Sequence, residues 1–268
     1  MADGAPGSAI RFAYTDTPFG QVHHAEAGSG PPLLCLHQTP RSWDEYRELL
    51  PLLARERRVI AMDTLGMGAS APPPGEATIE AYAEAALDLI DALGLGPIDL
   101  MGHHTGGVIA LEIAASAPTL VNRLVLSSTP WVDAASRERR AGRIPVDQVE
   151  VAGDGTHLTE LWAGRRAFYP EGRPDLLQRF VRDALAARDP AEGHRAVGRY
   201  RMEDRVAAVT APVLSIGASA DPHAFPDHGP LAERLTDVTL AVVDGGTVAL
   251  LEDKAEEVAD LVLDFLRT

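Results

Sequence analysis

Short apolar runs recur along the chain, and turn-forming residues follow each of them. Runs of about four to eight apolar residues bounded by turns are typical of strands that are buried on both faces of a parallel sheet. They lie at residues 32–36, 58–62, 97–101, 124–126, 212–217 and 240–243. Residues 10–26 instead alternate partly around a Pro-Phe-Gly break at 18–20, which predicts an antiparallel hairpin at the edge of the sheet.

Amphipathic stretches alternate with these runs. Residues 78–95 carry apolar side chains at helical spacing, and glycines at 94 and 96 mark the end of this predicted helix. Ser42 and Glu45 have the spacing of a capping box at the start of an earlier helix, and residues 253–256 cap a last helix that ends near Leu266. Strands that alternate with helices predict an α/β fold with a mostly parallel central sheet and helices on both faces.

The pattern changes between residues 131 and 209. This segment has polar-rich helical stretches and scattered aromatic residues, and no run in it resembles a buried strand. After residue 210 the strand pattern resumes. We therefore divide the chain into a core in two parts, residues 1–130 and 210–268, and a helical insertion at residues 131–209.

Composition and charge argue against a membrane protein and against a nucleic-acid-binding protein. No run approaches the length of a membrane helix, and residues 1–7 have neither the basic nor the apolar part of a secretory signal, so we expect a cytoplasmic protein without a membrane partner. The formal net charge of −15 opposes binding to nucleic acid. Within residues 131–209, however, 14 arginines stand against 13 acidic residues. This segment either favours an anionic ligand or presents solvated arginines on exposed helix faces.

Cysteine and histidine give no sign of a metal centre. Cys35 is the single cysteine, so no disulfide can form within the chain, and its apolar neighbours predict a buried thiol. No cluster of cysteine and histidine has the spacing of zinc ligands. We expect neither a metal nor a cofactor, and we expect a monomer or homodimer that acts on a small molecule.

The chemistry-bearing residues follow the predicted strands. In parallel sheets the ligand sits at the carboxyl ends of the strands. This rule gathers six residues at one rim of the sheet: Gln38, Thr39, His103, His104, Trp131 and Asp221. The adjacent pair His103 and His104 ends a strand, so we expect the two rings to point in opposite directions, with His103 toward the interior.

Four motifs in order resemble those of the α/β-hydrolase superfamily, from about residue 20 to the C-terminus. The turn at residues 37–40 is similar to the family's oxyanion turn, and the spacing of Asp63, Gly66, Gly68 and Ser70 is similar to the turn after its fourth strand. Gly102, His104 and Gly106 match the glycine-framed nucleophile elbow, and Asp221 follows Gly217 where the family places its triad acid. The resemblance implies an α/β-hydrolase fold in which residues 131–209 form a cap over the active site.

The chain departs from the motifs of this superfamily at three positions. His104 occupies the nucleophile position, Thr247 follows Gly245-Gly246 where the family has its catalytic histidine, and Gln38 replaces a glycine of the oxyanion turn. Asp221 alone remains of the triad. Because Thr247 vacates space beside the elbow, we expect the His104 ring to lean toward Asp221 and to form an acid/base pair, with the backbone N–H groups of Thr39 and Thr105 as an oxyanion site.

This pair suits a lyase, cyclase, isomerase or non-serine hydrolase that acts on a small, largely apolar carbonyl compound. Two alternatives stay open: a non-catalytic protein that binds a ligand in a relic site, and a hydrolase of esters, lactones or carbon–carbon bonds with a rearranged triad. Gln38 either contacts substrate or faces solvent, and Trp131 is either a wall of the pocket or part of the cap's core. His37 is expected to orient its turn, Asp133 is an alternative acid, and His223 and His228 enter the site if their loop folds inward.

Overall fold

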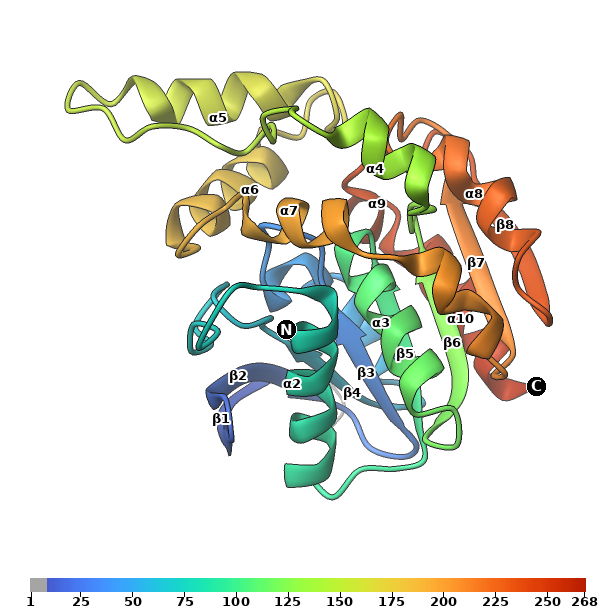
Figure 1. Cartoon of the computed structure of the whole chain (residues 1–268). Coiled ribbons are helices and arrows are strands. Elements are labelled where there is room, and N and C mark those ends of the chain that lie inside the picture. The colour runs from blue at the N-terminus through green and yellow to red at the C-terminus, as the bar shows by residue number, and fades with distance from the viewer. Residues whose placement is uncertain (1–8) are drawn as a thin grey trace.

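The computed structural model describes residues 9–268 and contains an eight-stranded sheet (Figure 1). The sheet order is β1-β2-β4-β3-β5-β6-β7-β8. The strands β1 and β2 form the predicted antiparallel hairpin, β2 is antiparallel to β4, and the remaining neighbours are parallel. Their bounds are β1 Arg11–Thr17, β2 Gly20–Ala27, β3 Pro32–Leu36, β4 Arg58–Met62, β5 Ile98–His103, β6 Val121–Ser127, β7 Val213–Ala218 and β8 Val238–Val243.

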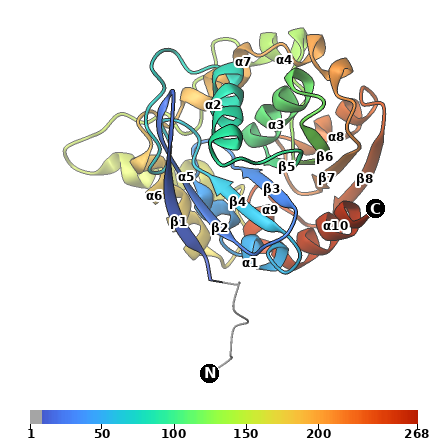
Figure 2. The ribbon, with the colours of Figure 1, turned by 90° about the horizontal axis from the view of Figure 1, so that it is seen from below.

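Helices cover both faces of the sheet, as the alternating pattern predicts (Figure 2). Helices α2, α3 and α8 cover one face, and α1 and α10 cover the other. A short α9 precedes α10, and a 3₁₀ helix, η1, precedes α1. The bounds are η1 Trp43–Tyr46, α1 Leu49–Leu53, α2 Ile79–Ala92, α3 Thr105–Ser116, α8 Phe225–Ala232, α9 Leu250–Asp253 and α10 Ala255–Arg267.

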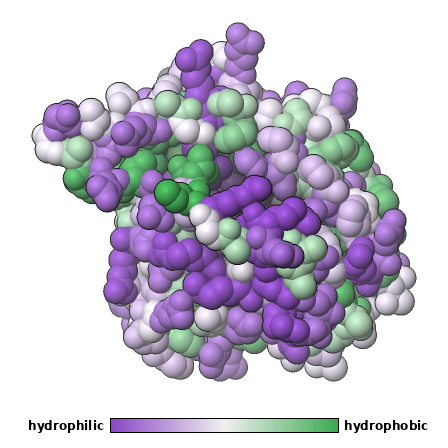
Figure 3. Space-filling view, turned by 45° about the horizontal axis from the view of Figure 1, so that its top comes forward, coloured by the Kyte–Doolittle hydropathy of each residue, from purple (hydrophilic) through white to green (hydrophobic). Residues whose placement is uncertain are grey.

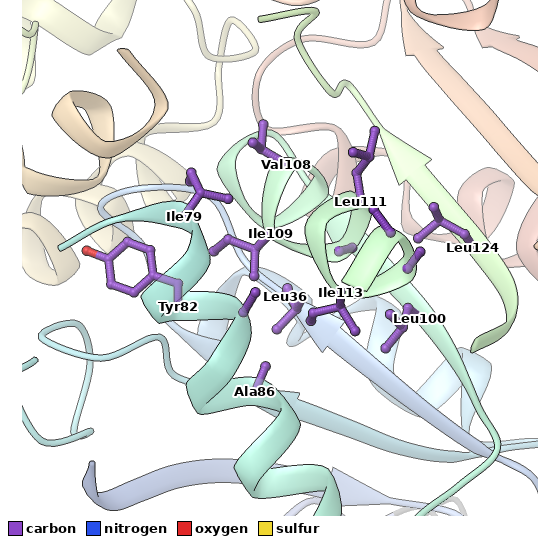
Figure 4. Close-up of a cluster of buried hydrophobic side chains, with 14 of the residues drawn as sticks. Leu36, Ile79, Tyr82, Ala86, Leu100, Val108, Ile109, Leu111, Ile113 and Leu124 are labelled. Carbon is purple, nitrogen blue, oxygen red and sulfur yellow. The ribbon is translucent and has the colours of Figure 1, made fainter. Parts of the chain in front are cut away.

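The two faces of the parallel strands are buried in separate clusters because successive side chains of a strand point to opposite sides. Leu34 and Leu36 of β3 pack with α2 and α3, where Ile79 and Ile109 fill the space between the two helices (Figure 4). Leu33 and Cys35 pack with α1 and α10 on the other side, and this confirms the buried thiol. Burial on both sides explains why the inner strands are apolar runs rather than alternating ones. The edge strand β8 differs from the expectation, since Leu240 and Val242 of its apolar run are exposed.

The predicted capping box at residues 42–45 is wrong. Ser42 does cap a helix, since its Oγ accepts a hydrogen bond from the N–H of Asp44, but this helix is the 3₁₀ turn η1. The Glu45 carboxylate turns away from the N-cap and accepts a hydrogen bond of 2.8 Å from the N–H of Gln38. Glu45 therefore binds a residue seven positions earlier in the sequence instead of the backbone of the N-cap residue Ser42.

Residues 131–209 form helices that lie over the end of the sheet where β6 leads into α4 (Figure 1). They have a small core of their own, in which Leu161, Leu176 and Phe180 are buried, and Ala249 of the main body packs against it. Figure 3 shows hydrophobic surface gathered beside the projecting arm around α5, next to a mostly hydrophilic face. The bounds are α4 Ala134–Arg140, α5 Thr156–Arg166, α6 Pro174–Ala186, α7 Glu192–Arg199, η2 Met202–Asp204 and η3 Val206–Ala208.

Among the described residues, every helix is too short or too polar to span a membrane.

Candidate active site

The turn from β5 into α3 holds His104 in a backbone conformation that side chains rarely adopt. Its φ is 47° and its ψ is −114°. Glycines on either side let the turn pack tightly, since a Cβ on Gly102 would lie 2.1 Å from the carbonyl oxygen of Gly106, and one on Gly106 would lie 1.9 Å from that of Leu36. Such a conformation costs about 1–3 kcal/mol and persists where the surrounding structure enforces it, commonly at functional sites.

The His104 ring lies against Asp221, which is in the turn after β7. Nε2 of His104 and Oδ2 of Asp221 are 2.8 Å apart, and the side chains are 13% and 0% exposed. The carboxylate oxygen lies off the direction of the ring N–H, and neither atom has a hydrogen-bond partner among residues 9–268. The pair is therefore a close contact between the ring and the carboxylate that is not aligned as a hydrogen bond.

Asp221 is held as an ionised carboxylate. Burial alone would raise its pKa, but the adjacent His104 and the N–H of His223, which donates to Oδ1 at 2.9 Å, lower the pKa well below its usual range. The N–H of Ala224 donates to the same oxygen at 3.3 Å. A permanent negative charge at this place stabilises a positively charged imidazole.

A cavity of about 700 Å³ lies between the sheet end and the cap, and His104 lines it together with Gln38, Thr39 and Thr105. Because Nε2 faces Asp221, Nδ1 is the ring nitrogen available to a ligand. The backbone N–H groups of Thr39 and Thr105 donate to none of the described residues. Thr105 is the first residue of α3, where the helix dipole favours negative charge. The arrangement places an imidazole, which Asp221 contacts from the protein interior, and two backbone donors at one cavity.

The model of the alpha/beta hydrolase fold family matches residues 31–252. The chain belongs to this family. It is also similar over nearly its whole length to a solved hydrolase from Pseudomonas aeruginosa, with a TM-score of 0.81, 26% identity, and coverage of 96% of this chain and 99% of that one. The predicted α/β-hydrolase fold is therefore confirmed.

Curated relatives in this family match a shorter segment. A soluble epoxide hydrolase of a Corynebacterium is 37% identical over 106 residues, which are 40% of this chain and 37% of that protein. A 2-hydroxymuconate semialdehyde hydrolase of a Pseudomonas is 37% identical over 111 residues, 40% of this chain and 39% of that one. The match thus spans about two fifths of the length of these hydrolases. The substrates in their names are those of the relatives.

Gln38 lines the cavity but does not face solvent, and neighbouring residues hold its side chain. It is 3% exposed, and its side-chain amide donates to Oε1 of Glu45 and, at 3.4 Å, to the carbonyl of Val248. Burial alone would raise the pKa of Glu45, but nearby His103 and Arg41 and the N–H of Gln38 hold it below its usual range. Gln38 thus anchors the turn at residues 37–40 to a buried carboxylate.

His103 points into the interior, as expected from its place on the strand. Its Nδ1 lies 2.9 Å from Oγ of Ser127 and its Nε2 lies 3.1 Å from the carbonyl oxygen of Val248. Burial lowers the pKa of His103 to about 4, so the ring is neutral near neutrality. The ring stands at 80° to that of His104, with 4.7 Å between the ring centres. It does not line the cavity, so it supports His104 from behind.

Trp131 and Asp133 also lie outside the cavity lining. The Trp131 indole donates to Oδ2 of Asp133 at 2.9 Å, and the guanidinium of Arg234 lies 4.5 Å from its ring centre. Asp133 caps α4 by accepting from the N–H of Ser136. The structure therefore does not bring this tryptophan to the site, and Asp133 is a helix cap rather than a partner of His104.

The remaining histidines near the site separate in the fold. His37 orients its turn, because its Nε2 accepts from the N–H of Thr64 at 2.9 Å. His223 lines the cavity, and its ring meets Phe168 edge to face with 4.4 Å between centres. His228 turns away from the cavity, with Nε2 3.1 Å from the carbonyl oxygen of Ser215.

The cap supplies a second histidine–carboxylate contact that sequence reasoning missed. His194 Nε2 lies 2.6 Å from Oδ2 of Asp147, and Arg165 Nε donates to Oδ1 of the same carboxylate at 2.6 Å. His194 and Arg165 both line the cavity. They are 47 and 18 residues from Asp147, so no local pattern links them, and the high arginine content of the insertion was the one available signal.

Among residues 9–268, no three His, Cys, Asp or Glu side chains gather as a metal site requires.

Proposed function

We propose that this protein is an enzyme in which His104, paired with Asp221, acts as a general acid and base on a small carbonyl-containing molecule. The observation that carries the proposal is the 2.8 Å contact of Nε2 with the buried carboxylate, which leaves Nδ1 toward the cavity. Reactions that need one base and an oxyanion site are eliminations, cyclisations, isomerisations and the attack of water on a carbonyl.

The proposed proton path is short. Nδ1 of His104 removes a proton from the carbon beside the carbonyl, or from a water molecule, and the imidazolium that forms is stabilised by Asp221. The negative charge that develops on the substrate oxygen is met by the N–H groups of Thr39 and Thr105, and such donors are worth about 2.7–4 kcal/mol each in known oxyanion sites. The imidazolium then returns the proton to carbon or to a leaving group.

Deuterium exchange tests this step without knowledge of the substrate. A panel of small ketones and lactones is incubated with the protein in D₂O, and loss of the α-proton signal is followed by NMR alongside product formation. We expect exchange by the natural protein and a fall of about 10²- to 10⁴-fold in His104→Ala and Asp221→Asn. The matched control is His157→Ala, because His157 lies on α5 outside the cavity lining.

Undiminished exchange or turnover in His104→Ala would overturn the proposal. The protein is a non-catalytic binder if compounds of the panel bind to it but undergo neither exchange nor conversion to product. In that case Asp221→Asn should bind them with the same affinity. Binding is read by titration NMR in the same samples.

A hydrolase with a rearranged triad is the second candidate, and one residue favours it. Ser128, the residue after β6, lies outside the cavity lining; its φ is 43°, and its buried Oγ has no hydrogen-bond partner among the described residues. A serine-directed fluorophosphonate would label such a nucleophile, and Ser128→Ala would abolish the label. Our first candidate predicts no labelling.

A further inference from the structure

The cavity is far more basic than the chain that surrounds it. Seven arginines contribute to its lining, against one acidic side chain, Asp227, although the net charge of the protein is −15. This lining does not favour the largely apolar molecule that the sequence alone suggests. A cleft lined by one sign of charge concentrates ligands of the opposite sign.

Four of these arginines are neutralised by acidic partners. The ion pairs are Arg137 with Glu203, Arg165 with Asp147, Arg195 with Asp189, and Arg199 with Glu76. The other three, Arg139, Arg140 and Arg143, have no carboxylate within ion-pair distance among residues 9–268. The excess positive charge of the cavity is therefore concentrated at one place in the cap.

Local structure brings these three arginines together. Arg139 and Arg140 are the last residues of α4, and Gly142, with a φ of 72°, reverses the chain so that the N–H of Arg143 donates to the carbonyl of Arg140 at 3.1 Å. Arg140 is partly buried, and burial lowers its pKa. The charges of Arg139 and Arg143 lower it further, whereas Asp227 opposes them.

Cations at the end of a helix are favourable to its dipole, and this effect accounts for Arg139 and Arg140. It does not account for Arg143, which lies beyond the helix end, or for the convergence of all three on a cavity. Guanidinium groups that repel one another are stabilised together by an oxyanion, which each of them can bind through paired N–H donors.

We propose that Arg139, Arg140 and Arg143 form a subsite for the carboxylate or phosphate group of an organic anion. A volume of about 700 Å³ suits a molecule that spans from this subsite to His104. The identity of this molecule as substrate rests on the proposed function, but the anion subsite itself does not.

Simple aromatic probes test the subsite. Benzoate, phenyl phosphate, neutral benzamide and cationic benzylamine are titrated into the protein at low salt, and dissociation constants are measured by NMR. We expect both anions to bind at least about tenfold more tightly than benzamide, and the preferred anion shows which oxyanion the subsite fits. Arg140→Gln should weaken anion binding by about tenfold and leave benzamide unaffected.

Two further variants keep the test decisive. Arg166→Gln is the matched control, because Arg166 is an exposed cap arginine outside the lining, and it should bind both anions as the natural protein does. If Arg140→Gln fails to fold, the exposed pair is changed instead in Arg139→Gln/Arg143→Gln, with the same expected loss. His104→Ala should retain anion binding, which separates this proposal from the chemistry.

The subsite is overturned if neither anion binds better than benzamide, or if folded Arg140→Gln binds both anions with unchanged affinity. It is also overturned if Arg166→Gln weakens binding as much as Arg140→Gln, because the effect is then one of general surface charge.

Discussion

Gly193 of α7 lies directly against Thr39 in the turn at residues 37–40. A Cβ on Gly193 would be 2.0 Å from Oγ1 of Thr39 and 2.9 Å from its Cβ, so α7 rests on the turn with no room for a side chain. The cap therefore packs on the same turn whose N–H group we assign to the oxyanion site.

Gly193→Ala should displace α7 from the turn. Overpacking of this kind typically costs about 1–3 kcal/mol. The control lies on the same helix: a Cβ on Gly198 meets nothing within 4 Å, so Gly198→Ala should stabilise the protein by about 0.4–1 kcal/mol. Urea unfolding of both variants gives the two free energies. Equal stabilisation by both substitutions would show that α7 does not press on Thr39.

The strained elbow can be tested without an assay of activity. His104→Gly and His104→Ala both remove the ring and its contact with Asp221, but glycine tolerates a φ of 47° and alanine does not. We expect His104→Gly to unfold with a free energy about 1 kcal/mol higher than His104→Ala. An alanine variant as stable as the glycine variant would argue for a relaxed turn.

His103 should make the protein less stable in mild acid. Its pKa is about 4 in the folded protein because of burial, and about 6.5 in the unfolded chain. Between these values the unfolded chain takes up a proton that the folded protein does not, so stability falls as the pH falls from 6.5 to 4, by about 3 kcal/mol.

The measurement is urea unfolding at several pH values for the natural protein and for His103→Gln. The amide should remove this dependence, so that the difference between the two proteins changes by about 1.4 kcal/mol per pH unit in that range. Parallel stability curves would contradict the assignment of the proton to His103.

Arg41 connects the cap to the core and should be costly to remove. It is fully buried, and it donates to both oxygens of Glu252 at 3.0 Å and to Oδ2 of Asp183 in α6 at 3.0 Å. Arg41→Met removes the two-pronged partner of Glu252 and one of the two cations on Asp183, which should cost up to about 3–5 kcal/mol in the free energy of unfolding. Arg182 stays 2.7 Å from Asp183, and Arg179 stays 3.5 Å from Glu252.

The double variant Arg41→Met/Glu252→Gln provides the control, since it also removes the charge of one carboxylate. It should recover part of the lost stability. A loss below about 1 kcal/mol in the single variant would mean that Arg179 and Arg182, rather than Arg41, neutralise these carboxylates.

The sequence by itself determined the strands, the hairpin and the glycine-framed turn at His104, because these depend on apolar runs and on backbone conformations that a few neighbouring residues impose. The bounds of β3 and β4 follow from their apolar runs alone. At Gly102 and Gly106 the neighbouring backbone comes so close that only glycine fits.

Only the tertiary structure decided which polar side chains meet. Glu45 has the spacing of a helix cap, yet it binds Gln38, and Trp131 follows its strand, yet it turns toward Asp133. Arg41 meets Glu252 across 211 positions of the chain. Such contacts depend on how distant segments pack together, and a buried polar side chain takes the partner that relieves its desolvation.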